Sequence, residues 1–133
     1  MREKCITTEY GSVYYWLSDI WNEEKETIFF FPGITADHTM FESQVDYFGA
    51  KYNLIVWDAP CHGKSRPYEK FDLEDSTKVI IKIMEENKVE QTKANVSSVD
   101  NKKDNEKKQT IHIIHPSNLG YNSLCTRCIS HSN

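Results

Sequence analysis

The sequence predicts an α/β fold built on parallel strands joined by a crossover helix. Two short runs, 28–31 and 54–57, are apolar at every position and are closed by turn residues. Strands of this kind suit a sheet that is covered on both faces. A strand, a helix and a second strand in this order place the two strands parallel in one sheet. The intervening segment has apolar residues at helical spacing, namely Met40, Phe41, Val45 and Phe48.

The length and the net charge of the chain limit the number of domains and the kinds of partner that we expect. A chain of 133 residues can bury one modest core, so we expect one domain at most. The formal net charge of -4 leaves no basic field, and we expect neither nucleic acid nor a membrane as a partner. The N-terminal residues lack an apolar signal core, which predicts a cytoplasmic location. The cysteines are then expected to be reduced thiols: Cys5, Cys61, Cys125 and Cys128.

The chain opens with a predicted β-hairpin. Segments 4–9 and 11–17 are rich in β-prone residues, and residues 10–12 provide a turn between them. The polar segment 22–26 is interpreted as a solvated turn before the first buried strand. Its charges need no functional explanation, because a turn at the surface is expected to be polar.

The first helix is expected to follow the strand at 28–31. Asp37 or Thr39 can cap its free backbone N–H groups, and Gly49 marks its end. After the strand at 54–57 the chain is expected to form a loop, because Pro67 disfavours a helical conformation at the residue before it. The two strands therefore end in loops at the same edge of the predicted sheet.

A second helix is predicted over 73–87. Asp72 or Asp75 can cap its first turn. Charged side chains occupy the face opposite its apolar stripe, which is typical of a helix that packs one face on a sheet. The stripe consists of Val79, Ile80, Ile83 and Met84.

The composition changes abruptly after this helix. Segment 90–109 is rich in Lys, Asn, Asp, Glu and Gln and cannot bury enough apolar surface to offset the entropy of ordering, so it is predicted to be a disordered linker. A strand is predicted at 110–114, followed by a polar tail. The expected organisation is therefore a structured unit at 1–89, the linker, and a short strand with its tail at 110–133.

The residues around the two buried strands resemble an α/β-hydrolase. The first strand is followed by Pro32-Gly33-Ile34, where that family has a His-Gly pair, and Pro32 takes the place of the His. The second strand is followed by 58–65, which matches the family's Asp-x-x-Gly-x-Gly-x-Ser loop except that Cys61 replaces the first Gly. The resemblance covers roughly the first ninety residues and implies the N-terminal part of a truncated hydrolase domain, with an open sheet edge that favours self-association.

The resemblance implies serine-dependent hydrolysis of a small-molecule ester, thioester or amide, without a cofactor. An alignment without gaps places Ser117 at the nucleophile position, with Ile34 and Asn118 as the backbone N–H donors of an oxyanion hole. Both glycines of the family's Gly-x-Ser-x-Gly turn are absent, and their places are taken by His115 and Leu119. An ordinary Pro-Ser-Asn turn is the alternative that the sequence favours.

The sequence assigns no acid and base to Ser117. Only His131 follows it among the histidines, and no Asp or Glu follows it at all. His38 and His62 lie on the two loops at the strand ends, where single histidines are more often solvated than catalytic. We therefore expect no Ser117-dependent ester hydrolysis from this chain alone.

The other class of function that the sequence leaves open is a non-catalytic remnant or a small zinc module. Cys125, Cys128 and His131, together with His112 or His115, have spacings that a tetrahedral zinc ion accepts. If 110–114 is a strand, the side chains of His112 and His115 point to opposite faces of the sheet. We therefore expect no bound metal.

Overall fold

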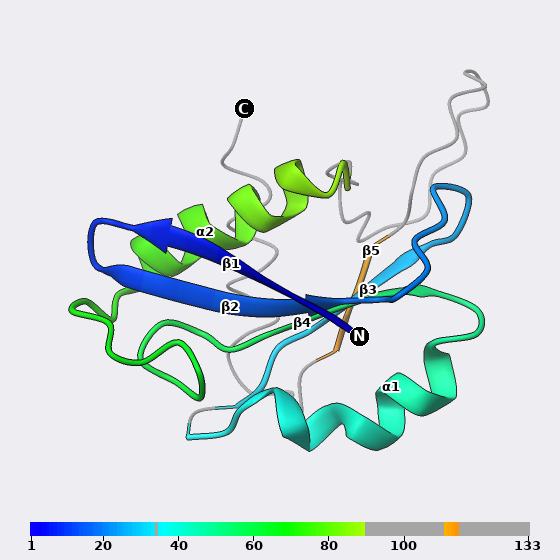
Figure 1. Cartoon of the computed structure of the whole chain (residues 1–133), viewed down its shortest axis with the longest axis horizontal. Coiled ribbons are helices and arrows are strands. Elements are labelled where there is room, and N and C mark those ends of the chain that lie inside the picture. Colours follow the sequence, from blue (N-terminus) through cyan, green and yellow to red (C-terminus); the bar gives the residue numbers. More distant parts are fainter. Residues whose placement is uncertain (34, 90–110, 115–133) are drawn as a thin grey trace, which may run out of the picture.

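The computed structural model describes residues 1–33, 35–89 and 111–114. Within these residues five strands form one mixed sheet in the order β1-β2-β4-β3-β5 (Figure 1). The predicted disordered linker and the polar tail after the last strand lie outside the described residues. No helix in the described ranges is both long and apolar enough to cross a membrane.

The N-terminal hairpin is confirmed. Strands β1 (Arg2–Thr8) and β2 (Gly11–Leu17) are antiparallel, and their register closes with Thr8 opposite Gly11. Tyr15, Trp16 and Leu17 of β2 then pair antiparallel with β4. The hairpin therefore extends one side of a sheet whose other strands run parallel.

The predicted parallel unit is also confirmed. Strand β3 (Thr27–Phe30) pairs parallel with β4 (Asn53–Trp57) on one side and with β5 (Ile111–Ile114) on the other. Every residue of β3 and β4 is buried, as expected for strands that are covered on both faces. The carboxyl ends of the three parallel strands consequently open at one edge of the sheet.

Helices cover opposite faces of the sheet (Figure 1). Helix α2 (Leu73–Glu86) packs on one face, where the core contains Tyr15, Phe29, Ile55, Trp57 and Ile83. The 3-10 turn η1 (His38–Phe41) and helix α1 (Glu42–Phe48) cover the other, where Phe41 packs on alternate strand residues. Those residues are Ile28, Phe30, Leu54 and Val56.

The cap of the first helical segment is Asp37, one of the two predicted residues. Its side chain accepts a hydrogen bond from the backbone N–H of Thr39 at 2.9 Å. The Thr39 hydroxyl and then the Thr39 backbone N–H lower the pKa of Asp37 below its ordinary value. The segment ends at Gly49, as the sequence predicted, although its first turn is a 3-10 helix.

Helix α2 begins at the predicted cap Asp72, which accepts a hydrogen bond from the backbone N–H of Asp75 at 2.7 Å. It ends in two reversed backbone hydrogen bonds, from the N–H of Val89 to the carbonyl of Met84 at 2.9 Å and from the N–H of Lys88 to the carbonyl of Glu85 at 3.1 Å. This is a Schellman motif, and the buried Val89 packs in the core that contains Met84.

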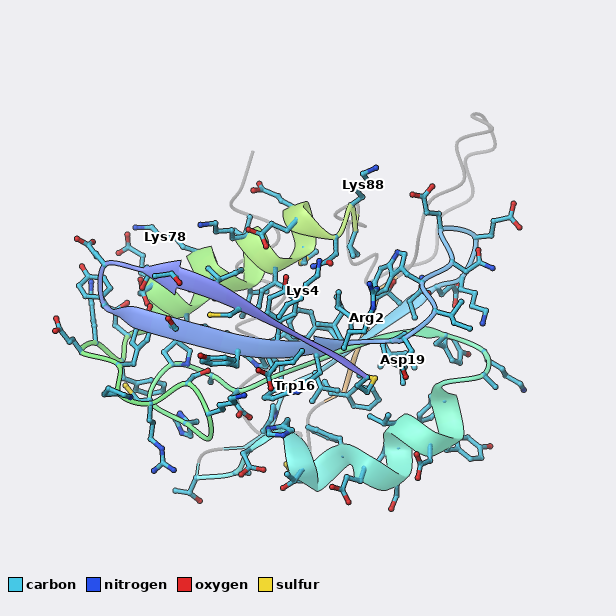
Figure 2. The ribbon with its side chains drawn as sticks, viewed as in Figure 1. Arg2, Lys4, Trp16, Asp19, Lys78 and Lys88 are labelled. Atoms are coloured by element: carbon cyan, nitrogen blue, oxygen red, sulfur yellow. The ribbon has the colours of Figure 1, made fainter. Side chains whose placement is uncertain are left out.

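Lys88 occupies the position of this motif that favours glycine. Its φ is 53°, and its side chain projects into solvent at the end of α2 (Figure 2).

Replacing Lys88 with glycine is expected to raise the free energy of unfolding by about 0.5–1 kcal/mol, because a side chain is strained at this φ. Urea denaturation measures the change. As a matched control, Lys82→Gly at an exposed residue in the middle of the helix should lower the free energy of unfolding by about 1 kcal/mol. If both variants changed the free energy of unfolding in the same direction, Lys88 would not occupy the glycine position of a Schellman motif.

Candidate functional site

Two loops meet at the carboxyl edge of β3 and β4. One runs from the end of β3 to η1, and the other runs from Asp58, directly after β4, to Ser65. In open α/β sheets, loops at the carboxyl ends of parallel strands form the ligand site. The contacts between these two loops therefore define the candidate site.

Asp58 joins the two loops. Its side chain is fully buried and accepts hydrogen bonds from the backbone N–H of His38 at 2.7 Å and of Lys64 at 2.8 Å. The ring Nδ1 of His38 lies 2.9 Å from the second carboxylate oxygen and 3.0 Å from the first. A buried carboxylate is tolerated only when its oxygens are satisfied in this way. Asp58 is thus the shared anchor of both loops.

His38 is held in one orientation. Its ring stacks on the indole of Trp16, with ring centres 3.6 Å apart and an interplanar angle of 19°. An ionised Asp58 only accepts hydrogen bonds, so the proton of a neutral His38 ring lies on Nδ1 and the lone pair on Nε2. Among the described residues, Nε2 has no hydrogen-bond partner. The expectation that His38 is simply a solvated loop histidine is therefore wrong.

His62, the other loop histidine, has no carboxylate partner in the described residues. Its Nδ1 lies 2.9 Å from the carbonyl oxygen of Pro60, and its ring lies near Phe71 with centres 5.4 Å apart. The neighbouring Cys61 has φ 69° and directs its Sγ to the carbonyl of Tyr68 at 3.2 Å. These two residues belong to the scaffold of the loop and form no thiol–imidazole pair.

Ser65 fastens the second loop to the sheet. Its buried hydroxyl donates to the carbonyl of Asp58 at 2.7 Å and accepts from the backbone N–H of Tyr14 at 2.9 Å. Gly63 has φ 47°, and a Cβ at this residue would overlap the Asp58 carboxylate. The serine and the glycine of the loop are therefore required by packing against Asp58 and β2.

Tyr68 ties the end of this loop to the rest of the domain. Its hydroxyl donates to the Asp75 carboxylate of α2 at 2.7 Å and lies 2.8 Å from the hydroxyl of Thr8 in β1. Burial raises the pKa of Tyr68 above its ordinary value, and the hydrogen bond to Asp75 raises it further. Asp75, which the sequence allowed as a helix cap, serves this contact.

Comparison with known proteins rests on structure. No family model matches the chain, and no curated protein matches its sequence. An α/β-hydrolase enzyme from a Medee basin deep-sea metagenome library superposes with a TM-score of 0.58 at 16% identity, over 65% of this chain and 32% of that one. A hydrolase from Pseudomonas aeruginosa superposes with a TM-score of 0.56 at 19% identity, over 65% of this chain and 33% of that one. The enol-lactonase from Burkholderia xenovorans superposes with a TM-score of 0.56 at 16% identity, over 65% of this chain and 34% of that one.

The chain has a partial α/β-hydrolase fold. It spans about a third of the length of these structures. The similarity agrees with the resemblance of the two loop sequences, although Pro32 and Cys61 depart from the family pattern. In the strand order of this chain, the chain crosses from β3 to β4 and later returns to the other side of β3.

The predicted catalytic positions of the hydrolase fold lie outside the described residues. These are the oxyanion donors Ile34 and Asn118 and the nucleophile Ser117. Strand β5, which precedes Ser117 in sequence, ends at the same sheet edge as β3 and β4. The His38 ring contacts Trp16 of β2 and Asp58 at the end of β4, and β3 lies between β4 and β5, so the ring is not positioned beside the end of β5.

The predicted zinc ligands also lie outside the described residues. They are Cys125, Cys128, His131 and His115, while His112 lies in β5. In the described part of the chain no group of three His, Cys, Asp or Glu side chains could hold a metal ion. Nothing observed in the hydrolase fold favours the metal-module alternative.

Sequence reasoning missed the pairing of His38 with Asp58. Asp58 follows the apolar run 54–57, and His38 begins the helical segment after the neighbouring parallel strand. These positions place both residues at one sheet edge, which is the signal that could have identified them. Their stacking partner Trp16 comes from the hairpin, and no local pattern links it to either loop.

Proposed function

We propose that this chain supplies part of the active site of a serine-dependent hydrolase acting on an ester, thioester or amide of a small molecule. The observation that carries the proposal is the sheet edge at which β3, β4 and β5 end, with Asp58 fixing the first two loops. Loops at this edge are where a hydrolase fold places its oxyanion donors and its nucleophile. Ile34, Ser117 and Asn118 are the residues proposed for these roles.

The proposed reaction transfers the acyl group twice. The Ser117 hydroxyl attacks the acyl carbon while a base takes its proton, backbone N–H groups of Ile34 and Asn118 stabilise the oxyanion, and the alcohol, thiol or amine leaves with a proton. Water then hydrolyses the acyl-serine and returns the enzyme. Because the sequence after Ser117 contains no Asp or Glu, this chain is proposed to be inactive alone.

An exogenous base tests this proposal. Without imidazole, wild-type chain and Ser117→Ala should hydrolyse p-nitrophenyl butyrate at the same rate. Added imidazole should raise the rate of the wild-type chain above that of Ser117→Ala, because only the base is missing from the proposed site. Mass spectrometry should detect butyryl-Ser117 in the same samples.

The Ser117→Ala protein is the matched control, since imidazole itself hydrolyses such esters in solution. Equal rates for both proteins at every imidazole concentration, with no acyl-Ser117, would contradict the proposal. Imidazole-independent hydrolysis that Ser117→Ala abolishes would instead show that the chain contains its own base.

The structural neighbours suggest which esters to try first. Two of them are described as an enol-lactonase and an N-acyl homoserine lactonase. A lactone is a cyclic ester, and its hydrolysis needs the same nucleophile and oxyanion donors. Small lactones are therefore the proposed first substrates. A cytoplasmic location, self-association through the sheet edges, and the absence of nucleic-acid or membrane partners remain parts of this proposal.

A further inference from the structure

His38 is an imidazole that is oriented by a buried charge and still reached by solvent. Its side chain is 31% exposed, whereas the carboxylate that it contacts, Asp58, is fully buried. The Nδ1–H of the neutral ring bonds this carboxylate, and the lone pair of Nε2 has no hydrogen-bond partner in the described part of the chain. The ring therefore combines a fixed tautomer with a free, accessible nitrogen lone pair.

His62 offers a comparison within the same molecule. Its Nδ1 lies 2.9 Å from the carbonyl oxygen of Pro60, so its neutral ring has the same tautomer as the ring of His38. The partner of His62 is a neutral carbonyl, and the partner of His38 is a carboxylate. A carboxylate stabilises the positive charge that develops on an attacking imidazole more strongly than a carbonyl does. His38 is consequently the stronger nucleophile of the two loop histidines.

Trp16 fixes the direction of the His38 lone pair. The indole stacks on one face of the imidazole, with ring centres 3.6 Å apart and an interplanar angle of 19°. Nucleophilic attack uses the lone pair of Nε2, which lies in the plane of the ring, so a group stacked on the ring face does not block it. The stack and the bond to Asp58 together hold the attacking atom in one orientation before a reactant arrives.

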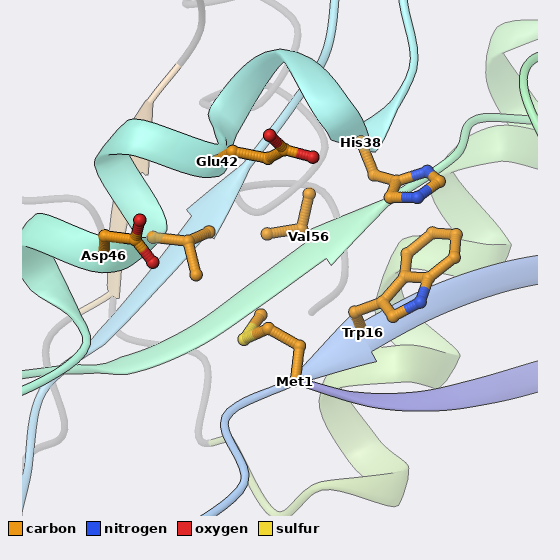
Figure 3. A pocket seen from close by; sticks show the side chains of 7 residues that line it. Met1, Trp16, His38, Glu42, Asp46 and Val56 are labelled. Atoms are coloured by element: carbon orange, nitrogen blue, oxygen red, sulfur yellow. The ribbon is translucent and has the colours of Figure 1, made fainter.

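The surroundings of His38 suit a reactant with a short apolar group. Figure 3 shows His38 and Trp16 side by side at one end of a cavity of about 250 Å³. The apolar side chains of Val45 and Val56 also line this cavity. Its volume is near the lower end of the range for small-molecule sites. A small neutral ester with an acyl chain of about four carbons can lie against this lining.

We propose that His38 is a catalytic nucleophile that accepts an acyl group on Nε2 from a small neutral aryl ester. Histidine is one of the side chains that form such covalent intermediates. Asp58 is the positioning residue, because it acts on the reaction only through the His38 ring. The step uses neither Ser117 nor the oxyanion donors assigned to it, and it is therefore independent of the proposed serine-dependent function.

The reaction proceeds in two balanced steps. Nε2 attacks the acyl carbon, the bond from that carbon to the aryl oxygen breaks, and the aryl oxide leaves. The ring becomes a positively charged acylimidazolium whose Nδ1–H stays on the Asp58 carboxylate. Water then attacks the acyl carbon and loses a proton to solvent, the bond from carbon to Nε2 breaks, and its electron pair restores the neutral ring.

Hydrolysis of p-nitrophenyl butyrate tests the proposal at about pH 7.5, where an imidazole is ordinarily neutral. His38→Gln should lower the protein-dependent rate about tenfold, because an amide nitrogen is not a nucleophile. His62→Gln is the matched control and should keep the wild-type rate. Ser117→Ala should keep it as well, since this step belongs to the rate that wild type and Ser117→Ala share. A rate retained by His38→Gln, or lost in Ser117→Ala, would overturn the proposal.

Labelling of the wild-type chain tests the same nucleophile without a substitution at His38. Diethyl pyrocarbonate, an activated acyl donor, should carbethoxylate His38 about tenfold faster than His62, as measured by peptide mass spectrometry. Asp58→Asn should bring this ratio close to one, because it keeps the shape of the side chain and removes the charge. Labelling of His38 no faster than that of His62, or a ratio that Asp58→Asn leaves unchanged, would contradict the role of the pair.

Discussion

Replacing Asp58 with alanine is expected to lower the free energy of unfolding by about 3–5 kcal/mol. The change leaves the backbone N–H groups of His38 and Lys64 without their acceptor and removes the partner of the His38 ring. Because a domain of this size has a total stability of about 5–15 kcal/mol, the loss is a large fraction of it. Urea denaturation followed by tryptophan fluorescence measures the change.

Two further variants show whether the loss comes from the buried carboxylate. Asp58→Asn keeps the shape but presents an amide N–H to a backbone N–H, so its loss should fall between those of wild type and Asp58→Ala. Asp46→Asn changes an exposed carboxylate and should stay within about 0.5 kcal/mol of wild type. A loss below about 1 kcal/mol for Asp58→Ala would show that water replaces the carboxylate without penalty.

The second large effect is expected at Gly63. Gly63→Ala should lower the free energy of unfolding by about 2–4 kcal/mol, because φ 47° strains any side chain and the new Cβ overlaps the Asp58 carboxylate. Thermal unfolding and urea denaturation both report this loss. Lys64→Ala is the matched control, since it keeps the backbone N–H that bonds Asp58 and removes only exposed contacts of the ammonium group, namely the ion pair with Glu3 and the cation–π contact with the Tyr14 ring.

A double-mutant cycle separates the two causes at Gly63. In the Asp58→Ala background the carboxylate is gone, so the additional loss caused by Gly63→Ala should shrink to the backbone strain of about 1–2 kcal/mol and the remaining close contact of the new Cβ with the Asp37 Cβ. Strict additivity of the two substitutions would mean that the close approach of Gly63 to Asp58 carries no energy. The cycle therefore measures the contact that holds the loop against β4.

The sequence predicted the elements of this fold because their signals are local. The runs at 28–31 and 54–57 are apolar throughout, and both strands proved to be buried at every residue. Asp37 and Asp72 were identified as caps because a short acceptor before an amphipathic stretch satisfies free N–H groups within a few residues. Each of these predictions depends on neighbours along the chain.

The contacts that define the candidate site depend on distant parts of the chain. Asp58 and His38 are twenty residues apart in sequence, and Trp16 comes from the hairpin. The alternation of apolar and polar residues along a strand predicts which side chains face the core, but it does not predict which distant residue a loop side chain contacts. The role of Tyr68 was likewise not predictable, because its hydroxyl bridges Asp75 and Thr8 from opposite ends of the described domain.

The way Asp58 joins the two loops has a kinetic consequence. Ordering a loop costs about 1–2 kcal/mol of conformational entropy for each residue. Where a loop closes only when a ligand arrives, the entropy cost of ordering that loop reduces the affinity for the ligand, and the closure slows association. In this domain the loops after β3 and β4 are already fastened by the amides of His38 and Lys64. For a ligand that reaches the β4 side of this edge, we therefore expect a rate of association governed by diffusion and orientation, without a closure step of the loop from Asp58 to Ser65.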